Sequence, residues 1–280
     1  MTRTFNAQST TDEVLEGVDL RGKRILVTGA SAGLGEQFAH LLARDGYDVV
    51  LVARSSARLE PVAERLRLHK VTPIVIPEDL SQPGAAKRVY DEVKSRGLEV
   101  SCLVNNAGYG STGPFLELPL GREVEMVQLN CATLLELCHL FGQEMRERKN
   151  GRILNIASTA GFQPGPYMAT YYATKAFVVS FSEALAYELK DSGVTVTCHC
   201  PGATATEFSG RAGNDSSRLF QRPGGVPKAQ DVAAHAYEAM LQGEVLSVHG
   251  LLNWVSMQSL RLSPRAVVRS ITAALNSKPE

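Results

Sequence analysis

The stretch that decides the fold is TGASAGLG, residues 28–35. It follows the short apolar run 24–27 and leads directly into a segment with helical spacing. Glycines between a first strand and a first helix let the backbone turn sharply and approach a pyrophosphate, which then lies at the positive end of the helix. The place of this turn favours a nucleotide site over an ordinary glycine-rich loop.

Apolar strands and helical segments alternate along the rest of the chain. Strands are predicted at 24–27, 49–52, 74–76, 102–104, 153–156, 194–196 and 245–248, and helices at 34–45, 56–69, 84–96, 122–149, 171–191 and 230–242. The alternation predicts an α/β fold, a doubly wound parallel sheet (Rossmann fold) of about seven strands with helices on both faces. A C-terminal helical extension follows.

Three segments are expected along the chain. A polar N-terminal leader covers 1–22, and a Rossmann-type dinucleotide-binding and catalytic domain covers 23–250. Residues 251–280 are a C-terminal helical extension of the same domain. The segment 207–229 is rich in Gly, Ser, Arg and Pro, and we expect a mobile loop that acts as the lid of the substrate pocket.

Composition excludes several classes of protein. Lys plus Arg and Asp plus Glu both total 29, so no basic excess points to a nucleic-acid partner. No apolar run approaches the about 18 residues of a membrane span, so no transmembrane segment is expected. The five cysteines form no CxxC pair, which favours a reduced, cytoplasmic setting.

The sequence Cys198-His199-Cys200 resembles a ligand cluster at first sight. It continues a strand with a period of two, which would send both thiols to one face. Buried strand cysteines are therefore favoured over a metal site, and no metal is expected.

The end of the second strand indicates which cofactor is preferred. Ala53 offers no carboxylate to the adenosine ribose, and Arg54 can form a charge-assisted fork with a 2′-phosphate. Arg58 lies one helical turn on and could assist. These residues favour NADP(H), with NAD(H) possible if Arg54 is only a solvated surface residue.

Tyr171 and Lys175 form a Tyr-x-x-x-Lys pair at the start of a predicted helix. The spacing puts both side chains on one face, where an ammonium lowers the pKa of the phenol toward working pH. Ser158 follows the fifth predicted strand, from where its hydroxyl can bond to the reacting oxygen.

These residues carry a resemblance to the short-chain dehydrogenase/reductase family over about residues 20–250. The glycine spacing is similar to the TGxxxGxG turn of that family. The matching motifs are Thr28 to Gly35, Asp79-Leu80, Asn105-Asn106-Ala107-Gly108, Asn130, Ser158, Tyr171, Lys175 and Pro201-Gly202.

With Arg54, the resemblance implies a set of cofactor-binding residues in which Asp79 and Leu80 flank the adenine. The segment 201–206 would meet the carboxamide, and Lys175 would bond the nicotinamide ribose. The full set is Gly29, Ser31, Gly33, Leu34, Gly35, Arg54, Asp79, Leu80, Asn106, Ala107, Gly108, Tyr171, Lys175, Thr204 and Thr206.

The resemblance also implies a catalytic set of Asn130, Ser158, Tyr171 and Lys175. Asn130 would hold a water that links Lys175 to bulk solvent. The implied activity is an NADPH-dependent interconversion of a carbonyl and an alcohol by hydride transfer, with Tyr171 as general acid and base. Ala157 departs from the family, which often has a second Ser there, and the tail resembles a reductase branch with an extra C-terminal helical segment.

The substrate pocket is less legible. An apolar or aromatic ketone, an aldehyde, a steroid-like or an acyl substrate is expected, although several of the proposed wall residues could instead pack in the core. The proposed walls are Phe162, Pro164, Tyr167, Met168, Phe208, Leu219, Phe220 and Trp254. A tail helix that closes the pocket or meets another subunit is favoured over a membrane anchor.

Apolar residues beyond one core-facing stripe mark two of the predicted helices. They are Leu134, Leu135, Phe177 and Phe181. By resemblance these helices pair between subunits, which implies a homodimer or homotetramer. The partners expected are a small-molecule carbonyl or alcohol substrate and copies of the chain itself.

Two other classes of function stay open. One is a non-catalytic NADP(H)-binding regulatory protein, which loss of Tyr171, Lys175 or Ser158 would have signalled; all three are present. The other is an interaction protein on the same fold, favoured only if the cofactor fails to bind.

Overall fold

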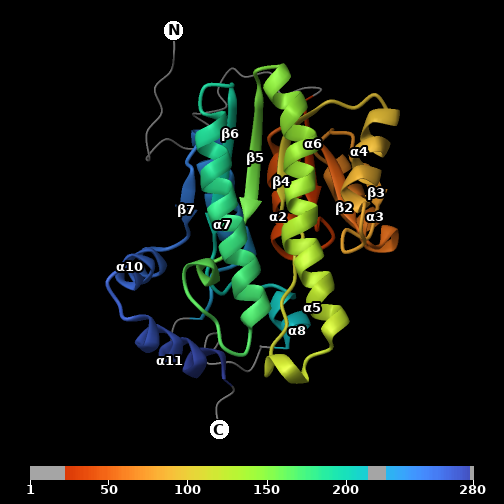
Figure 1. Cartoon of the computed structure of the whole chain (residues 1–280). Helices are drawn as coiled ribbons and strands as arrows, with labels where there is room; N and C mark the ends of the chain where they lie inside the picture. Colours follow the sequence, from red (N-terminus) through yellow and green to blue (C-terminus); the bar gives the residue numbers. More distant parts are fainter. Residues whose placement is uncertain (1–22, 214–224, 278–280) are drawn as a thin grey trace.

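A computed structural model of the chain describes residues 23–213 and 225–277, so the predicted leader over 1–22 lies outside the described residues. The described residues form a seven-stranded parallel sheet in the order β3-β2-β1-β4-β5-β6-β7 (Figure 1). The strands are β1 (Arg24–Thr28), β2 (Asp48–Ala53), β3 (Ile74–Pro77), β4 (Val100–Asn105), β5 (Gly151–Ile156), β6 (Val194–Cys200) and β7 (Leu246–Val248). The predicted doubly wound fold is confirmed.

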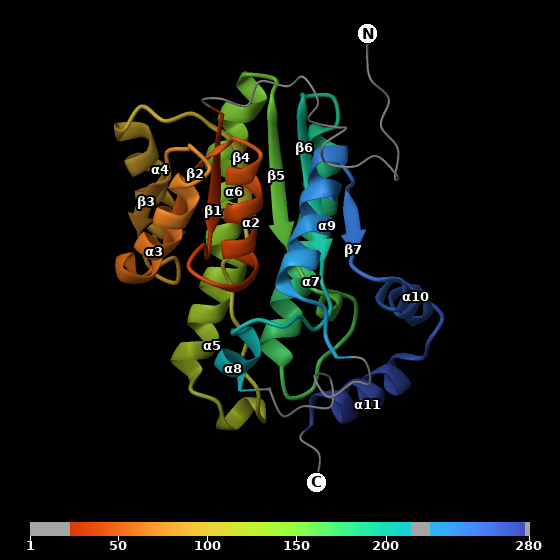
Figure 2. The same ribbon diagram turned by 180° about the vertical axis from the view of Figure 1, so that it is seen from behind.

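Helices cover both faces of the sheet. The main ones are α2 (Gly33–Arg44), α3 (Ser56–Arg67), α4 (Ala85–Ser95), α5 (Leu120–Val127), α6 (Leu134–Glu147), α7 (Ala169–Leu189) and α9 (Ala229–Gln242). Helices α4, α6 and α7 lie on the face seen in Figure 1, and α2, α3 and α9 on the face seen in Figure 2.

Two apolar cores result from the alternation of strand side chains. In β1, Ile25 and Val27 join the core under α2, α3 and α9, while Leu26 joins the core under α4, α6 and α7. A strand buried on both faces must be apolar at nearly every position. The strands could therefore be predicted from continuous apolar runs in the sequence.

The predicted helix over 122–149 is wrong as a single element. The structure has α5, a π-helical stretch over Gln128–Thr133 (η2), and then α6. The wider turn carries Asn130. Its side-chain amide donates hydrogen bonds to the Tyr109 carbonyl and to Thr174 Oγ1, outside its own helix. Apolar periodicity alone does not register this extra residue in the turn.

Two regions outside the sheet, the segment 207–229 and the C-terminal extension, contain helices. The expected loop over 207–229 begins with a short helix, α8 (Phe208–Ala212), and residues 214–224 lie outside the described residues. The C-terminal extension consists of two helices, α10 (Leu251–Leu260) and α11 (Arg265–Asn276). Both lie beyond the sheet, near the ends of the strand arrows (Figure 1).

Several sequence expectations about individual side chains have a definite outcome. Cys198 and Cys200 are both buried, with their sulfur atoms 3.9 Å apart, on the face that packs against α6 and α7. Leu134 is buried in that core, whereas Leu135 and Phe177 are 41% and 37% exposed. The pairing of these helices between subunits stays a prediction.

A buried polar network ties the centre of the sheet to α7. The Asn105 amide on β4 donates to Asn155 Oδ1 on β5 at 2.9 Å, and Asn155 Nδ2 donates to Ser182 Oγ at 2.9 Å. All three side chains are at most 3% exposed. Buried amides need such partners, because an unpaired one retains its full desolvation penalty.

Replacing Asn155 with alanine should therefore destabilise the fold. We expect Asn155→Ala to lower the free energy of unfolding by about 2–4 kcal/mol, since it removes a buried hydrogen-bond partner from both Asn105 and Ser182 and opens a small cavity. Urea unfolding followed by circular dichroism measures the loss. Ser95→Ala is the control, because its exposed hydroxyl bonds only to the Glu92 carbonyl in its own helix; equal losses in both variants would contradict the role of the network.

Candidate active site

A cavity of about 850 Å³ lies at the carboxyl edge of the sheet. It extends from the glycine turn after β1 to the inner sides of α10 and α11. In open α/β sheets, ligands bind at this edge, where neighbouring strands send their connections to opposite faces. Here that point lies between β1 and β4.

The glycine turn at one end of the cavity has no room for side chains. Gly29 and Gly33 have φ of +66° and +59°, in the left-handed region that glycine adopts without strain. A Cβ on Gly35 would lie 2.2 Å from the Gly29 carbonyl oxygen and 2.6 Å from Asn106 Nδ2. The turn thus presents bare backbone at the start of α2, as dinucleotide binding requires.

Neighbouring loops complete this half of the cavity. The Asn106 amide donates to the Thr28 carbonyl at 2.9 Å, which fixes the loop after β4 against the glycine turn. Asp79 accepts hydrogen bonds from the backbone and hydroxyl of Ser81, and the Leu80 carbonyl accepts one from Thr133 Oγ1 at 2.8 Å. Ser31, Leu34, Ala107 and Gly108 also line the cavity, so these residues fit a dinucleotide.

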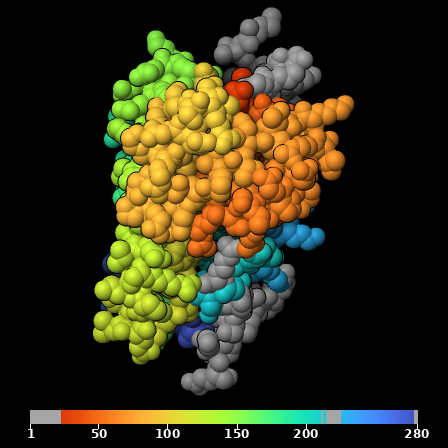
Figure 3. Space-filling view, turned by 90° about the vertical axis from the view of Figure 1, so that its right-hand side faces the viewer, coloured from red at the N-terminus to blue at the C-terminus, as the bar shows by residue number. Residues whose placement is uncertain are grey.

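Figure 3 shows this side of the molecule. Segments that include α3 and α4, in orange, form its upper part, and α5 and α8, in yellow-green and cyan, meet them from below. Arg54 and Asp79 from the upper part, and Arg122 and Phe208 from the lower part, line the same cavity.

Two arginines after β2 lie at the nucleotide end. Arg54 is exposed and lines the cavity, as does Arg58. Arg58 Nη2 pairs with Glu207 Oε2 at 2.8 Å, which joins α3 to the segment just before α8. A 2′-phosphate would therefore have Arg54 beside it, while Arg58 would have to exchange or share its bond with Glu207.

The segment after β6 crosses from the nucleotide end to the reacting centre. Thr206 packs toward the glycine turn, because a Cβ on Gly33 would meet its Cβ at 3.4 Å. The Thr206 hydroxyl accepts from the Phe208 backbone N–H at 3.2 Å, and Thr204 donates to the Gly202 carbonyl at 3.0 Å. Both threonines line the cavity.

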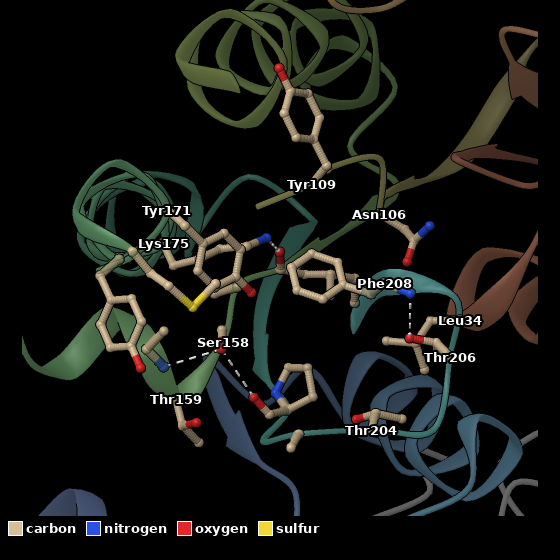
Figure 4. A pocket seen from close by; sticks show the side chains of 18 of the residues that line it. Leu34, Asn106, Tyr109, Ser158, Thr159, Tyr171, Lys175, Thr204, Thr206 and Phe208 are labelled. Atoms are coloured by element: carbon tan, nitrogen blue, oxygen red, sulfur yellow. Dashed lines mark hydrogen bonds between the residues drawn. The ribbon is translucent and has the colours of Figure 1, made fainter. Parts of the chain in front are cut away.

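The structure brings Ser158, Tyr171 and Lys175 together in this cavity (Figure 4). Ser158 caps the short helix after β5 by accepting from the Ala160 N–H at 3.1 Å, and its hydroxyl also donates to the Pro201 carbonyl at 3.3 Å. Lys175 Nζ donates to the Ile156 carbonyl at 2.7 Å and lies 5.8 Å from the centre of the Tyr171 ring.

Burial controls the ionisation of this group. It raises the pKa of Tyr171 above the ordinary value of a phenol, against a smaller lowering effect of the Ser158 hydroxyl. It also lowers the pKa of Lys175 to about 8. The net shift of the Tyr171 pKa is therefore upward, opposite to the lowering that the sequence predicted, because desolvation of the buried phenol is the largest cause.

Asn130 lies next to this group. A Cβ on Gly108 would come 3.0 Å from Asn130 Oδ1 and 3.7 Å from Lys175 Nζ, so both side chains border the same glycine. The Asn130 amide donates to the Tyr109 carbonyl and to Thr174 Oγ1, each at 3.0 Å. Its orientation is thus fixed by the protein, and the linking water stays a prediction.

Apolar side chains form the other half of the cavity. Met168 and Phe208 line it as expected, and the Phe208 ring lies 5.3 Å from that of Tyr171. The other described candidates, Phe162, Pro164, Tyr167 and Trp254, do not line it, and Leu219 and Phe220 lie outside the described residues. Tyr167 and Trp254 are instead about half exposed, and Phe162 packs against the core under α7.

The actual wall comes largely from residues that sequence reasoning missed. They are Tyr172, Met257, Leu260, Val267, Val268, Ile271 and Leu275. Most belong to α10 and α11, which agrees with the expectation that a tail helix closes the pocket, although the helical spacing of apolar residues did not identify the inward-facing side chains. That spacing does not say what the buried side faces.

The profile of the short chain dehydrogenase family matches residues 23–217. The chain belongs to this family. The chain is similar to the very-long-chain 3-oxoacyl-CoA reductase of Phaeosphaeria nodorum, with 38% identity over 184 residues that cover 64% of this chain and 54% of the relative. The reductase of that name from Anas platyrhynchos is 36% identical over 195 residues, 67% of this chain and 62% of the relative.

The chain spans about half the length of the fungal relatives that it matches. Among solved structures, a short-chain dehydrogenase from Sphingobium yanoikuyae in complex with NADPH superposes with a TM-score of 0.77 at 32% identity, over 86% of this chain and 93% of that one. The bulky-bulky ketone specific alcohol dehydrogenase from Comamonas testosteroni gives 0.72 at 30% identity, over 92% and 99%.

Two features are absent from the described residues. Over 23–213 and 225–277, no three His, Cys, Asp or Glu side chains gather as a metal site would require. In the same ranges, no helix has both the length and the apolar character to cross a membrane.

The glycine turn gives a direct test of the nucleotide half. Gly35→Ala should weaken NADPH binding at least about tenfold, because the new methyl group overlaps the Gly29 carbonyl and forces the turn open. Quenching or enhancement of NADPH fluorescence on titration measures the affinity. Gly121→Ala is the matched control, since a Cβ there meets nothing within 4 Å; wild-type affinity in Gly35→Ala would remove the turn from the binding site.

Proposed function

We propose that the protein is an NADPH-dependent reductase of an apolar ketone, with Tyr171 as proton donor. The observation that carries the proposal is that Ser158, Tyr171 and Lys175 line one cavity with the glycine turn. A nucleotide site and a proton donor in one enclosed space are what a carbonyl reductase needs. The family and the NADPH complex of a solved relative support the same reading.

In the proposed reaction, the hydroxyls of Ser158 and Tyr171 hold the substrate oxygen by hydrogen bonds. When bound, the nicotinamide cofactor supplies the hydride. Tyr171 gives its proton to the oxygen as negative charge develops there, and Ser158 stabilises that charge. Lys175 stands beside the Tyr171 ring, where its charge stabilises the phenolate that remains.

Burial raises the pKa of Tyr171, so its phenol carries the proton that reduction of a carbonyl requires. A buried phenol is protonated at neutral pH and is ready to donate, whereas oxidation of an alcohol requires the phenolate. Cofactor and substrate contacts with Lys175 would favour its charged form and so assist the proton transfer.

The cavity wall supports an apolar substrate. Met257, Val268 and Leu275 line the substrate half together with Phe208, so a carbonyl at Ser158 would carry an apolar group toward α10 and α11. The relatives named for 3-oxoacyl-CoA reduction and the alcohol dehydrogenase named for bulky ketones fit this chemistry. A 3-oxoacyl thioester with an aliphatic chain is our first candidate.

The second candidate is a non-catalytic NADP(H)-binding regulatory or interaction protein. Such a protein would bind NADP(H) at the glycine turn as the reductase does, but it would not reduce a substrate. Oxidation of NADPH with candidate 3-oxoacyl thioesters and bulky ketones, followed by absorbance, separates the two. Binding of NADPH without any turnover favours the regulatory role.

The proton donor is tested by removing one hydroxyl. Tyr171→Phe should lower kcat by about 10²–10⁴-fold, the usual contribution of general acid–base catalysis, while NADPH affinity stays close to wild type. Tyr187→Phe is the control, because this residue is on the same helix but 71% exposed. A Tyr171→Phe enzyme with kcat within twofold of wild type would remove Tyr171 from the chemistry.

The cofactor preference is tested at Arg54. Arg54→Ala should reduce the ratio of kcat/KM for NADPH over NADH by about tenfold, since a charge-assisted bond to the 2′-phosphate contributes about 1.5 kcal/mol. Arg67→Ala, which removes an arginine at the far end of α3, should leave the ratio unchanged. An unchanged ratio in Arg54→Ala would exclude Arg54 as the phosphate ligand.

A further inference from the structure

Helix α11 is attached to the catalytic region by one buried face. Its residues Val268, Thr272 and Asn276 recur every four positions and are 6%, 1% and 3% exposed. The side chains between them are mostly exposed or line the cavity. Thr272 and Asn276 are polar, so the attachment relies on hydrogen bonds as well as on apolar packing.

Asn276 makes two of these bonds, both to the region around Tyr171. Its Oδ1 accepts from the Tyr172 hydroxyl at 3.1 Å, and its Nδ2 donates to the Pro166 carbonyl at 3.0 Å. The Tyr172 ring is held against bare backbone, because a Cβ on Gly165 would lie 2.1 Å from its Cγ. Tyr172 is itself 6% exposed, so its hydroxyl has little access to water.

The two tyrosines at the start of α7 therefore point to different tasks. Tyr171 borders Phe208 within the cavity, and Tyr172 turns toward α11, with the two rings 6.1 Å apart and nearly perpendicular. Because they are adjacent in the chain, the backbone fixes the distance between the proposed proton donor and the attachment point of α11. Figure 1 shows α11 just beyond this end of α7.

We propose that Tyr172 and Asn276 are a specificity-determining pair that holds α11 in place as the far wall of the substrate cavity. Val268, Ile271 and Leu275 of α11 line that wall. A long apolar group on the substrate would reach them, and a short one would not. The proposal rests on the proposed reduction of an apolar carbonyl and adds the part of the protein that selects the size of the apolar group.

The test compares two substrates of different length in the full chain with NADPH. The probes are 3-oxobutanoyl-CoA and 3-oxododecanoyl-CoA. Asn276→Ala should raise KM for the long probe by roughly 5- to 10-fold, the range expected for one or two buried hydrogen bonds, and KM for the short probe by less than about twofold. The effect should fall on KM more than on kcat, since Asn276 does not line the cavity.

Two further variants identify the pair. Tyr172→Phe keeps the ring on Gly165 and removes only the hydroxyl. It should therefore also raise KM for the long probe more than for the short one, but by a smaller factor than Asn276→Ala. The double variant should be no worse than Asn276→Ala, because both changes break the same bond. Ser270→Ala is the control on the exposed side of α11, where the hydroxyl bonds only to Ala266 in its own helix.

An independent readout does not need turnover. Hydrogen–deuterium exchange of residues 265–276 should speed up in Asn276→Ala and in Tyr172→Phe but not in Ser270→Ala. Equal changes in KM for both probes, or a loss confined to kcat, would overturn the proposal, as would unchanged exchange in Asn276→Ala. If the wild type reduces neither probe, the proposed 3-oxoacyl activity fails, and the exchange experiment alone decides whether the pair holds α11.

Discussion

One buried hydroxyl, that of Thr28, joins the two halves of the sheet at the point where a ligand would bind. It donates to the Val104 carbonyl at 3.3 Å and accepts from the backbone N–H groups of Asn106 and Ala107 at 3.0 Å each. The glycine turn and the loop after β4 are thereby locked together at the switch point between β1 and β4. The position of the cavity depends on this junction, because Gly29 and Asn106, which lie next to it, line the cavity.

Next to that junction, desolvation is the main cause of the pKa shifts of Tyr171 and Lys175. Tyr171 and Lys175 are both buried, so the phenol keeps its proton and the lysine holds its charge less firmly than in water. An electrostatic interaction is stronger in such surroundings, so a bound ligand that raises the pKa of Lys175 would also strengthen the effect of its charge on Tyr171. The same burial makes the hydrogen bond between Lys175 and the Ile156 carbonyl necessary, since an unpaired ammonium there would be costly.

The C-terminal helices complete the cavity from outside the sheet. They contribute Met257, Leu260, Val267, Val268, Ile271 and Leu275 to its apolar wall, while other side chains of α10, including Leu251 and Leu252, remain exposed. Helix α11 is joined to the start of α7 by the bond from the Tyr172 hydroxyl to Asn276 Oδ1 at 3.1 Å, so the cavity wall is coupled to the helix that carries Tyr171 and Lys175.

The sequence alone determined the sheet and its glycine turn, because these depend on short-range patterns: buried strands are continuously apolar, and Gly29, Gly33 and Gly35 serve one local turn. The π-helical stretch at Asn130, the pKa shifts of Tyr171 and Lys175, and the bond from Tyr172 to Asn276 were decided by the tertiary structure. Each joins residues far apart in the chain or depends on burial. Periodicity can predict that α11 has an apolar side, but only the packed structure decides that this side meets the start of α7 and closes the cavity.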